Sequence, residues 1–218
     1  DDHRKIHVAP TDSAEAAHFL GSSISVHDEV RREMLRVYMS DAVPEYVDDG
    51  ATLLLQQGRE CFSTLGLESN RIIASKQDCL LIPWAGDRVM NTMRLQLLAR
   101  GLNAKKSPLA LLVRQCKPER IHELLPALEH DDTPAVVLAQ HARNTTVHKH
   151  HRRLPAELLA LDYASEFLDV YGAAQAWSAT RSNARRSHPS RRLPRPQRRS
   201  GTSWGSCSSP SSSTISAP

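Results

Sequence analysis

The sequence is poor in several features that mark known classes of protein. Aromatic residues make up 5% of the 218 residues, and no apolar run approaches the roughly 18 residues that a membrane-spanning helix needs. The four cysteines, Cys61, Cys79, Cys116 and Cys207, form no C-x-x-C pair, so neither a disulfide framework nor a zinc knuckle is predicted. Three of them lie in apolar or helical surroundings, typical of reduced core thiols. With no apolar leader at its start, the chain is expected to be cytoplasmic and to have no membrane partner.

The motifs of nucleotide-binding and nucleophilic enzymes are also missing. Lys105 and Lys106 follow Gly101, but the second glycine of the phosphate-binding loop G-x-x-x-x-G-K-[ST] is absent. Asp28 and Glu29 fall inside an amphipathic helical pattern, and not at a strand end where an acidic metal box would lie. No Ser, His and Asp set and no Cys and His pair stands out. The sequence therefore predicts no catalytic residue and no cofactor in this chain.

The excess of basic charge is confined to the end of the chain. The whole sequence has 28 basic and 24 acidic residues, a net charge of +4. Residues 178–218 hold eight arginines, no lysine and no acid, so residues 1–177 have 20 basic and 24 acidic residues and a net charge of −4. The overall charge therefore does not indicate a basic nucleic-acid groove.

What the sequence does contain is one clear strand, turn and helix between residues 78 and 101. Residues 79–82 form a short apolar run, typical of a strand covered on both faces, and Pro83 ends it. Asp87 is expected to cap a helix that Gly101 stops. The apolar residues of this helix recur three and four apart on one face: Val89, Met90, Met93, Leu97 and Leu98.

Further elements are predicted around this unit. Apolar spacing indicates an antiparallel pair of helices within residues 26–66, the second stopped by Gly66. A strand at 70–75 should pair with the central strand through the three-residue turn 76–78. Strands at 103–106 and 109–113 follow, and then a helix at 118–128 whose inward-facing residues are Ile121, Leu124, Leu125 and Leu128. The predicted fold class is mixed α/β: a small sheet with helices packed on one face, a helical C-terminal segment and a disordered tail.

Five segments divide the chain. They are the end of a preceding sheet with a loop (1–25), the helical pair (26–66), an α/β module (67–130), a basic connector with C-terminal helices (131–177) and an Arg/Ser/Pro tail (178–218). In the fourth segment we expect helices at 133–140 and 154–168, with Leu158 and Leu161 among the buried residues, and then only a short turn at 170–172.

The tail changes character abruptly after Trp177. Its 41 residues include 13 serines, eight arginines and five prolines without periodicity, which predicts too little apolar burial for folding. One interpretation is a disordered basic arm that binds nucleic acid or acidic partners. The other is translation out of frame, which is favoured because the change falls within a helical pattern.

The turn around Trp84 has two interpretations. Trp84 is either a core or subdomain-contact aromatic, or it stacks on a base or docks a partner while Arg88 and the turn amides hold a phosphate. Thr92 lies one turn beyond Arg88 on the same helix. Trp84, Arg88 and Thr92 are therefore candidate nucleic-acid-binding residues.

The connector at residues 141–153 is rich in histidine and in basic residues. Its four histidines could suggest a transition-metal site, but Lys149 and Arg152 would repel a cation and no carboxylate lies at helical spacing. We therefore predict no metal, and either a plain polar connector or a basic loop that meets a phosphate backbone. In the second case Lys149 and Arg152 are further candidates for nucleic-acid binding.

Four stretches of sequence occur in an order known from one protein family. They are SVHDEV (25–30) with Met34, A-x-x-LL-x-x-GR-x-x-F (51–62), IPWAGDRVMNT (82–92), and LPAELL (154–159) with YAS (163–165) and Leu168-Asp169. Together they resemble the region beyond the motor core of bacterial Lhr-like (large helicase-related) DEAD/DEAH-box helicases, over roughly residues 3–173.

The resemblance implies a C-terminal accessory fragment of an ATP-dependent helicase. Such a fragment would contact single-stranded DNA or RNA or brace the motor domains, while ATP and Mg²⁺ would bind motor motifs upstream of Asp1. No catalytic role carries over to residues of this chain. The alternative is a non-enzymatic protein-interaction module, in which Trp84 and the helix of residues 154–168 bind another protein. It is favoured by the net charge of −4 in residues 1–177.

Overall fold

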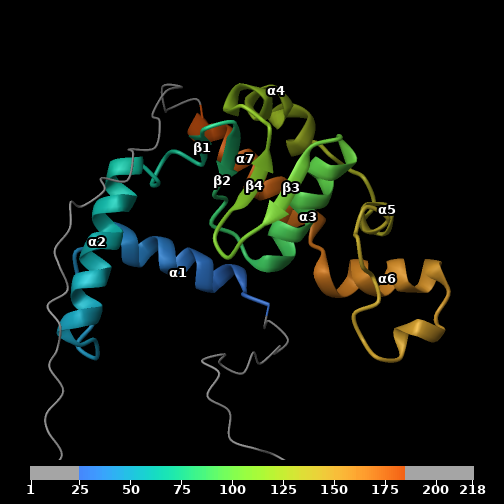
Figure 1. Ribbon diagram of the computed structural model, residues 1–218, viewed down its shortest axis with the longest axis horizontal. Helices are drawn as coiled ribbons and strands as arrows, with labels where there is room; N and C mark the ends of the chain where they lie inside the picture. The colour runs from blue at the N-terminus through green and yellow to red at the C-terminus, as the bar shows by residue number, and fades with distance from the viewer. Residues whose placement is uncertain (1–24, 185–218) are drawn as a thin grey trace, which may run out of the picture.

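The computed structural model describes residues 25–184 of the chain. This part has a mixed α/β fold, in which a four-stranded antiparallel sheet is packed against helices (Figure 1). The predicted fold class is thereby confirmed. Residues 1–24 and 185–218, on which the expectations of a preceding sheet and of a basic or out-of-frame tail largely depend, lie outside the described residues.

The sheet has the strand order β1-β2-β4-β3. Its strands are β1 (Ile72–Ser75), β2 (Asp78–Leu81), β3 (Asn103–Lys106) and β4 (Leu111–Arg114). The β1–β2 hairpin has a two-residue turn. Asp78 pairs with Ser75 and so belongs to β2, whereas the prediction placed it in a three-residue turn. Side chains alternate, so that Cys79 and Leu81 are fully buried while Leu80 is only half-buried. The expectation of a strand covered on both faces is therefore met fully on one face and only in part on the other.

Three helices cover the buried face of the sheet. They are α3 (Asp87–Ala99), α4 (Pro118–Glu129) and α7 (Val170–Ala184), and their apolar side chains form one core with the strands. Figure 1 shows α7 behind the sheet. The apolar spacing predicted for α3 and α4 is confirmed, since Met93, Ile121 and Leu128 are wholly buried.

Helix α7 corrects the predicted end of the folded region. In place of a short turn at 170–172, a 15-residue helix runs to Ala184, past the change of composition at Trp177. Thr180 is 1% exposed, and Nη1 of Arg181 lies 2.6 Å from Oε2 of Glu129. Residues 178–184 are therefore helical and not part of a disordered tail.

The start of α3 differs from the predicted cap. Gly86, not Asp87, is the N-cap residue, and the Asp87 carboxylate instead accepts from the Val26 amide and pairs with Lys106 at 3.3 Å. A Cβ at Gly86 would lie 2.7 Å from the Asp28 nitrogen and 2.8 Å from the Val26 oxygen. Glycine is needed here because α1 approaches the turn closely. Gly101, with φ of +75°, follows the helix as predicted.

Helices α1 (Asp28–Met39) and α2 (Asp49–Leu65) form an arm beside the sheet. Asp48 caps α2, and Gly66, with φ of 63°, ends it as predicted. The two helices are not the predicted antiparallel pair, because they cross where the end of α1 meets the middle of α2 (Figure 1). Part of the apolar surface of α2 is left uncovered, since Leu53 is 55% and Leu54 68% exposed.

Three short elements complete the described chain: α5 (Ala135–Ala139), the 3₁₀ turn η2 (His151–Arg153) and α6 (Ala156–Phe167). Tyr163 and Ala164 of α6 pack with α5 against the outer side of α3. Leu158 and Leu161, predicted to be buried, are 48% and 53% exposed. The prediction fails because α6 meets the rest of the fold along one narrow face only.

Candidate nucleic-acid interface

Trp84 joins the arm to the α/β module. It has a positive φ of 54°, is 7% exposed, and its ring lies 6.1 Å from Tyr38 and 6.0 Å from Phe62 between ring centroids. Its Nε1 donates to the Leu67 carbonyl at 3.4 Å. This geometry matches the interpretation of Trp84 as a subdomain-contact aromatic. A base could stack on the indole only by displacing Tyr38 or Phe62, so base stacking stays a prediction.

Arg88 and Thr92 are engaged at the junction between α6 and α7. Nη2 of Arg88 donates to the carbonyls of Ser165 and Leu168 at 2.8 and 2.7 Å. These carbonyls lie at the C-terminal end of α6, where backbone oxygens have no partner within the helix. Thr92 is wholly buried and its hydroxyl accepts from the Asp169 amide at 2.8 Å. Both side chains therefore hold α6 and α7 on α3, and their contact with nucleic acid stays a prediction.

Lys149 and Arg152 lie on the connector at the other end of α6. Both are exposed, as are Arg143 and Arg153, and within residues 25–184 none of the four cationic groups has a hydrogen bond or ion pair. Helix α6 has 12 residues and so separates this cluster from Arg88 by about 18 Å. The structure therefore divides the five predicted residues into three that are hydrogen-bonded within the fold, Trp84, Arg88 and Thr92, and two exposed ones without such bonds to residues 25–184, Lys149 and Arg152.

His151 fastens the connector to α6. It is 6% exposed, its Nδ1 accepts from the amides of Val147 and His148, and its Nε2 lies 3.4 Å from the Asp162 carboxylate. The rings of His148 and His151 lie edge to face with their centroids 4.7 Å apart, and Nε2 of His148 is 3.1 Å from Oε2 of Glu166. These contacts order the loop, while Lys149 and Arg152 make no hydrogen bond or ion pair with the part of the chain that the structure describes.

The sequence analysis did not predict the contacts between these histidines and the carboxylates of α6. Asp162 and Glu166 are four residues apart and so share a face of α6, but nothing in the connector itself indicates that they meet its histidines. In the described part of the chain, no group of three or more His, Cys, Asp or Glu residues is placed to hold a metal ion.

Charge is unevenly divided over the described residues. Residues 25–70, which include the arm, have four basic and nine acidic residues, a net charge of −5. Residues 71–184 have 15 basic and 11 acidic residues, a net charge of +4. The net negative charge of residues 1–177 therefore hides a basic half, and the connector belongs to it.

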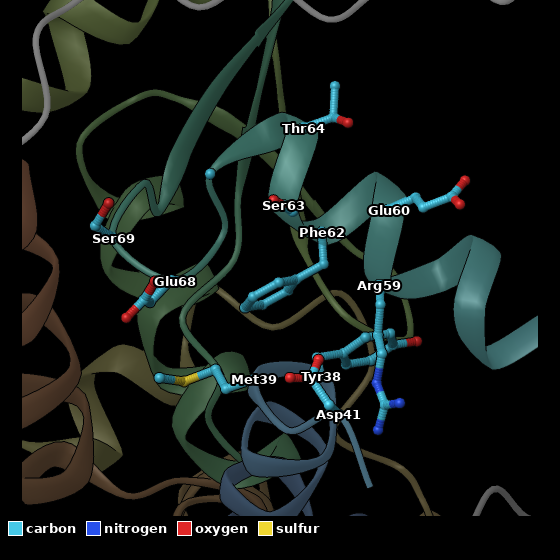
Figure 2. Close-up of a pocket in the computed structure, with 11 residues that line it drawn as sticks. Tyr38, Met39, Asp41, Arg59, Glu60, Phe62, Ser63, Thr64, Glu68 and Ser69 are labelled. Atoms are coloured by element: carbon cyan, nitrogen blue, oxygen red, sulfur yellow. The ribbon is translucent and has the colours of Figure 1, made fainter. Parts of the chain in front are cut away.

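A cleft of about 640 Å³ lies between the end of α1 and the end of α2 (Figure 2). Its charged residues are Asp41, Glu60, Glu68 and Arg59, and the Arg59 guanidinium is bonded to the carbonyls of Val37 and Ala42. The lining includes serine and threonine but no histidine or lysine that could activate a hydroxyl. The cleft repels phosphate and offers no nucleophile system.

The described cysteines also offer no candidate catalytic thiol. Burial, with smaller contributions from Cys116 and Glu119, raises the pKa of Cys79 to about 12, so its thiol stays protonated at neutral pH. Burial also raises the pKa of Cys116. Cys61 is exposed on α2, contrary to the expectation of a core thiol.

Comparison with protein-family models, with curated proteins and with solved structures finds no match for this chain. Among the helices of residues 25–184, none has both the length and the apolar character to cross a bilayer.

Proposed function

We propose that this chain is a non-catalytic accessory module that contacts single-stranded nucleic acid through its connector, residues 141–153. The observation that carries the proposal is the set of four exposed cations, Arg143, Lys149, Arg152 and Arg153, which have no partner within residues 25–184. Because His151 holds the loop against α6, these cations are presented together, and binding costs less backbone entropy than it would for a disordered loop. Phosphate oxygens are the ligands that such a cluster attracts most strongly.

The resemblance to the region beyond the motor core of Lhr-like helicases supports placing this module in an ATP-dependent helicase. In that setting ATP and Mg²⁺ bind the motor domains and this chain supplies no group to the hydrolysis. Trp84, Arg88 and Thr92 contribute by bracing: Trp84 fixes the arm, and Arg88 and Thr92 fix α6 and the connector it bears.

The proposal is tested by the salt dependence of binding. Fluorescence anisotropy with a labelled single-stranded DNA, and separately an RNA, should be recorded for the full chain between 25 and 200 mM salt. Removing two phosphate contacts with Lys149→Gln and Arg152→Gln should flatten the slope of log K against log salt by about 1.4, because each contact with a single strand contributes about 0.7.

A matched pair of lysines provides the control. Lys76→Gln and Lys117→Gln remove the same charge from exposed positions away from the connector, and all variants keep residues 185–218. The control pair should leave the slope nearly unchanged. Equal slopes for the connector pair and the control pair would refute the proposed interface.

A second candidate, a protein-interaction module, is supported by the arm. Residues 25–70 carry a net charge of −5, and large apolar side chains of the arm are exposed, Leu54 at 68% and Tyr46 at 89%. An acidic surface with exposed apolar groups repels phosphate and suits a basic protein surface. An arm variant that loses a protein contact while keeping the salt slope would separate the two functions.

A further inference from the structure

We propose that two copies of this chain associate head to tail, the arm of one copy docking on the connector end of the next. The arm takes no part in the proposed contact with nucleic acid, whereas the connector does.

Exposed apolar side chains gather at two places in the described residues. The arm surface is Met39, Val43, Tyr46, Leu53 and Leu54, with exposed fractions from 42% to 89%; the connector surface is Val137, Val147, Leu154, Leu158 and Leu161, with fractions from 40% to 53%. Only Val30 and Tyr171 are large apolar residues of similar exposure elsewhere in residues 25–184. Apolar groups concentrated in this way mark contact surfaces.

The connector surface contains a helical stripe. Leu158 and Leu161 are three residues apart and so lie on one side of α6, and Leu154 lies just before the helix, ahead of its N-cap Pro155. No element of the described chain covers this stripe. A partner that lies along α6 could therefore bury all three leucines at once.

The charges around the two surfaces are complementary. Residues 37–58, around the arm surface, contain four acids (Asp41, Glu45, Asp48 and Asp49) and no basic residue. Residues 133–161, which span the connector surface, contain four basic residues (Arg143, Lys149, Arg152 and Arg153) and one acid, Glu157. Each surface repels another of its own kind and attracts the other, which favours a heterologous contact over a symmetric one.

The two surfaces cannot meet within one molecule. Figure 1 shows α2 at one end of the described fold and α6 at the other, with the sheet between them. The contact must therefore form between copies, and a head-to-tail contact of this kind leaves one free surface at each end and permits longer chains or rings.

The test measures the mass of the full chain by sedimentation velocity from 1 to 200 µM, at 25 and 300 mM salt. The wild-type chain should grow beyond a dimer as concentration rises, and more so at low salt. The arm variant Asp41→Lys with Glu45→Lys and the connector variant Lys149→Glu with Arg152→Glu should each remain monomeric. All four residues are exposed, so these changes leave the core intact.

An equimolar mixture of the two variants tests whether the arm of one copy binds the connector of another. Each retains the surface that the other lacks, so an equimolar mixture should form a 1:1 dimer and nothing larger. A wild-type chain that stays monomeric up to 200 µM, or a mixture that gives no dimer, would overturn the proposal.

An occupant of the arm other than a second copy of the chain would give a different result in this experiment. If the seven arginines of residues 185–218 occupied the arm, the connector variant would associate as well as the wild type, which would also overturn the proposal. The nucleic-acid interface is judged independently. The arm variant keeps the connector intact, so it should lose self-association and retain the wild-type salt slope.

Discussion

Nε1 of Trp177 donates a 2.7 Å hydrogen bond to Oε1 of Gln96, and both side chains are wholly buried. The pair joins α7 to α3 across the core, 81 residues apart in sequence. It explains why the fold continues past the point at which the composition of the chain changes, because the indole anchors α7 before its serine-rich last turns begin.

Replacing Trp177 by Phe should destabilise the fold although it keeps most of the apolar volume. The Gln96 amide would be left without its partner in the core, which costs about 1–3 kcal/mol in the free energy of unfolding. Urea denaturation monitored by circular dichroism measures this. The exposed Tyr171→Phe change in the same helix is the control and should have no measurable effect.

Shortening the chain should show where the fold ends. Ending it after Trp177 removes the buried Thr180 and the Arg181–Glu129 pair, and so should lower the free energy of unfolding by at least about 1 kcal/mol. Ending it after Ala184 retains both and should leave the melting temperature unchanged. Equal melting temperatures for the two shortened chains would contradict this role for residues 178–184.

Trp84→Ala separates the two interpretations of that residue. A buried aromatic in contact with Tyr38 and Phe62 should cost about 3–5 kcal/mol of stability on truncation. At a temperature where the variant is still folded, its affinity for a single strand should match the wild type. A stable variant with tenfold weaker binding would instead support base stacking at Trp84.

Gly86→Ala tests the close approach of α1 to the turn before α3. The added methyl group meets backbone atoms of Asp28 and Val26 and should destabilise the fold by about 1–3 kcal/mol. Gly50→Ala, in the first turn of α2, has 3.4 Å to its nearest contact and should raise stability by up to about 1 kcal/mol. Thermal unfolding of the two variants should therefore shift in opposite directions.

Asp131 should make stability depend on pH in the acid range. Burial acts to raise its pKa, but hydrogen bonds from Thr133 and Arg100 outweigh burial and hold the pKa below the ordinary value of 3.8. Because the folded state favours the charged form, the contribution is complete well above pH 3.8 and is lost as pH falls through the lower folded-state pKa. Melting temperatures of Asp131→Asn should therefore fall less between pH 5 and pH 3 than those of the wild type.

Local signals in the sequence determined most of the helices and strands. The apolar run at 79–82, the glycines that end α2 and follow α3, and the spacing of Ile121, Leu125 and Leu128 act over a few residues, and each predicted its element correctly. The antiparallel hairpin and the mixed α/β class follow from the order of these elements.

The surfaces and the site were decided only by the tertiary structure. Helical spacing marked Leu54, Leu158 and Leu161 as apolar positions, but whether a partner element covers such a stripe depends on how far helices cross, which local sequence does not specify. In the same way, Arg88 meets the carbonyl of Leu168 and His151 meets Asp162 through contacts between separate elements. Helix α7 extends past Trp177 because that side chain is buried against α3 and the sheet, and packing energy outweighs the weak helix propensity of the Ser, Thr and Asn residues that follow.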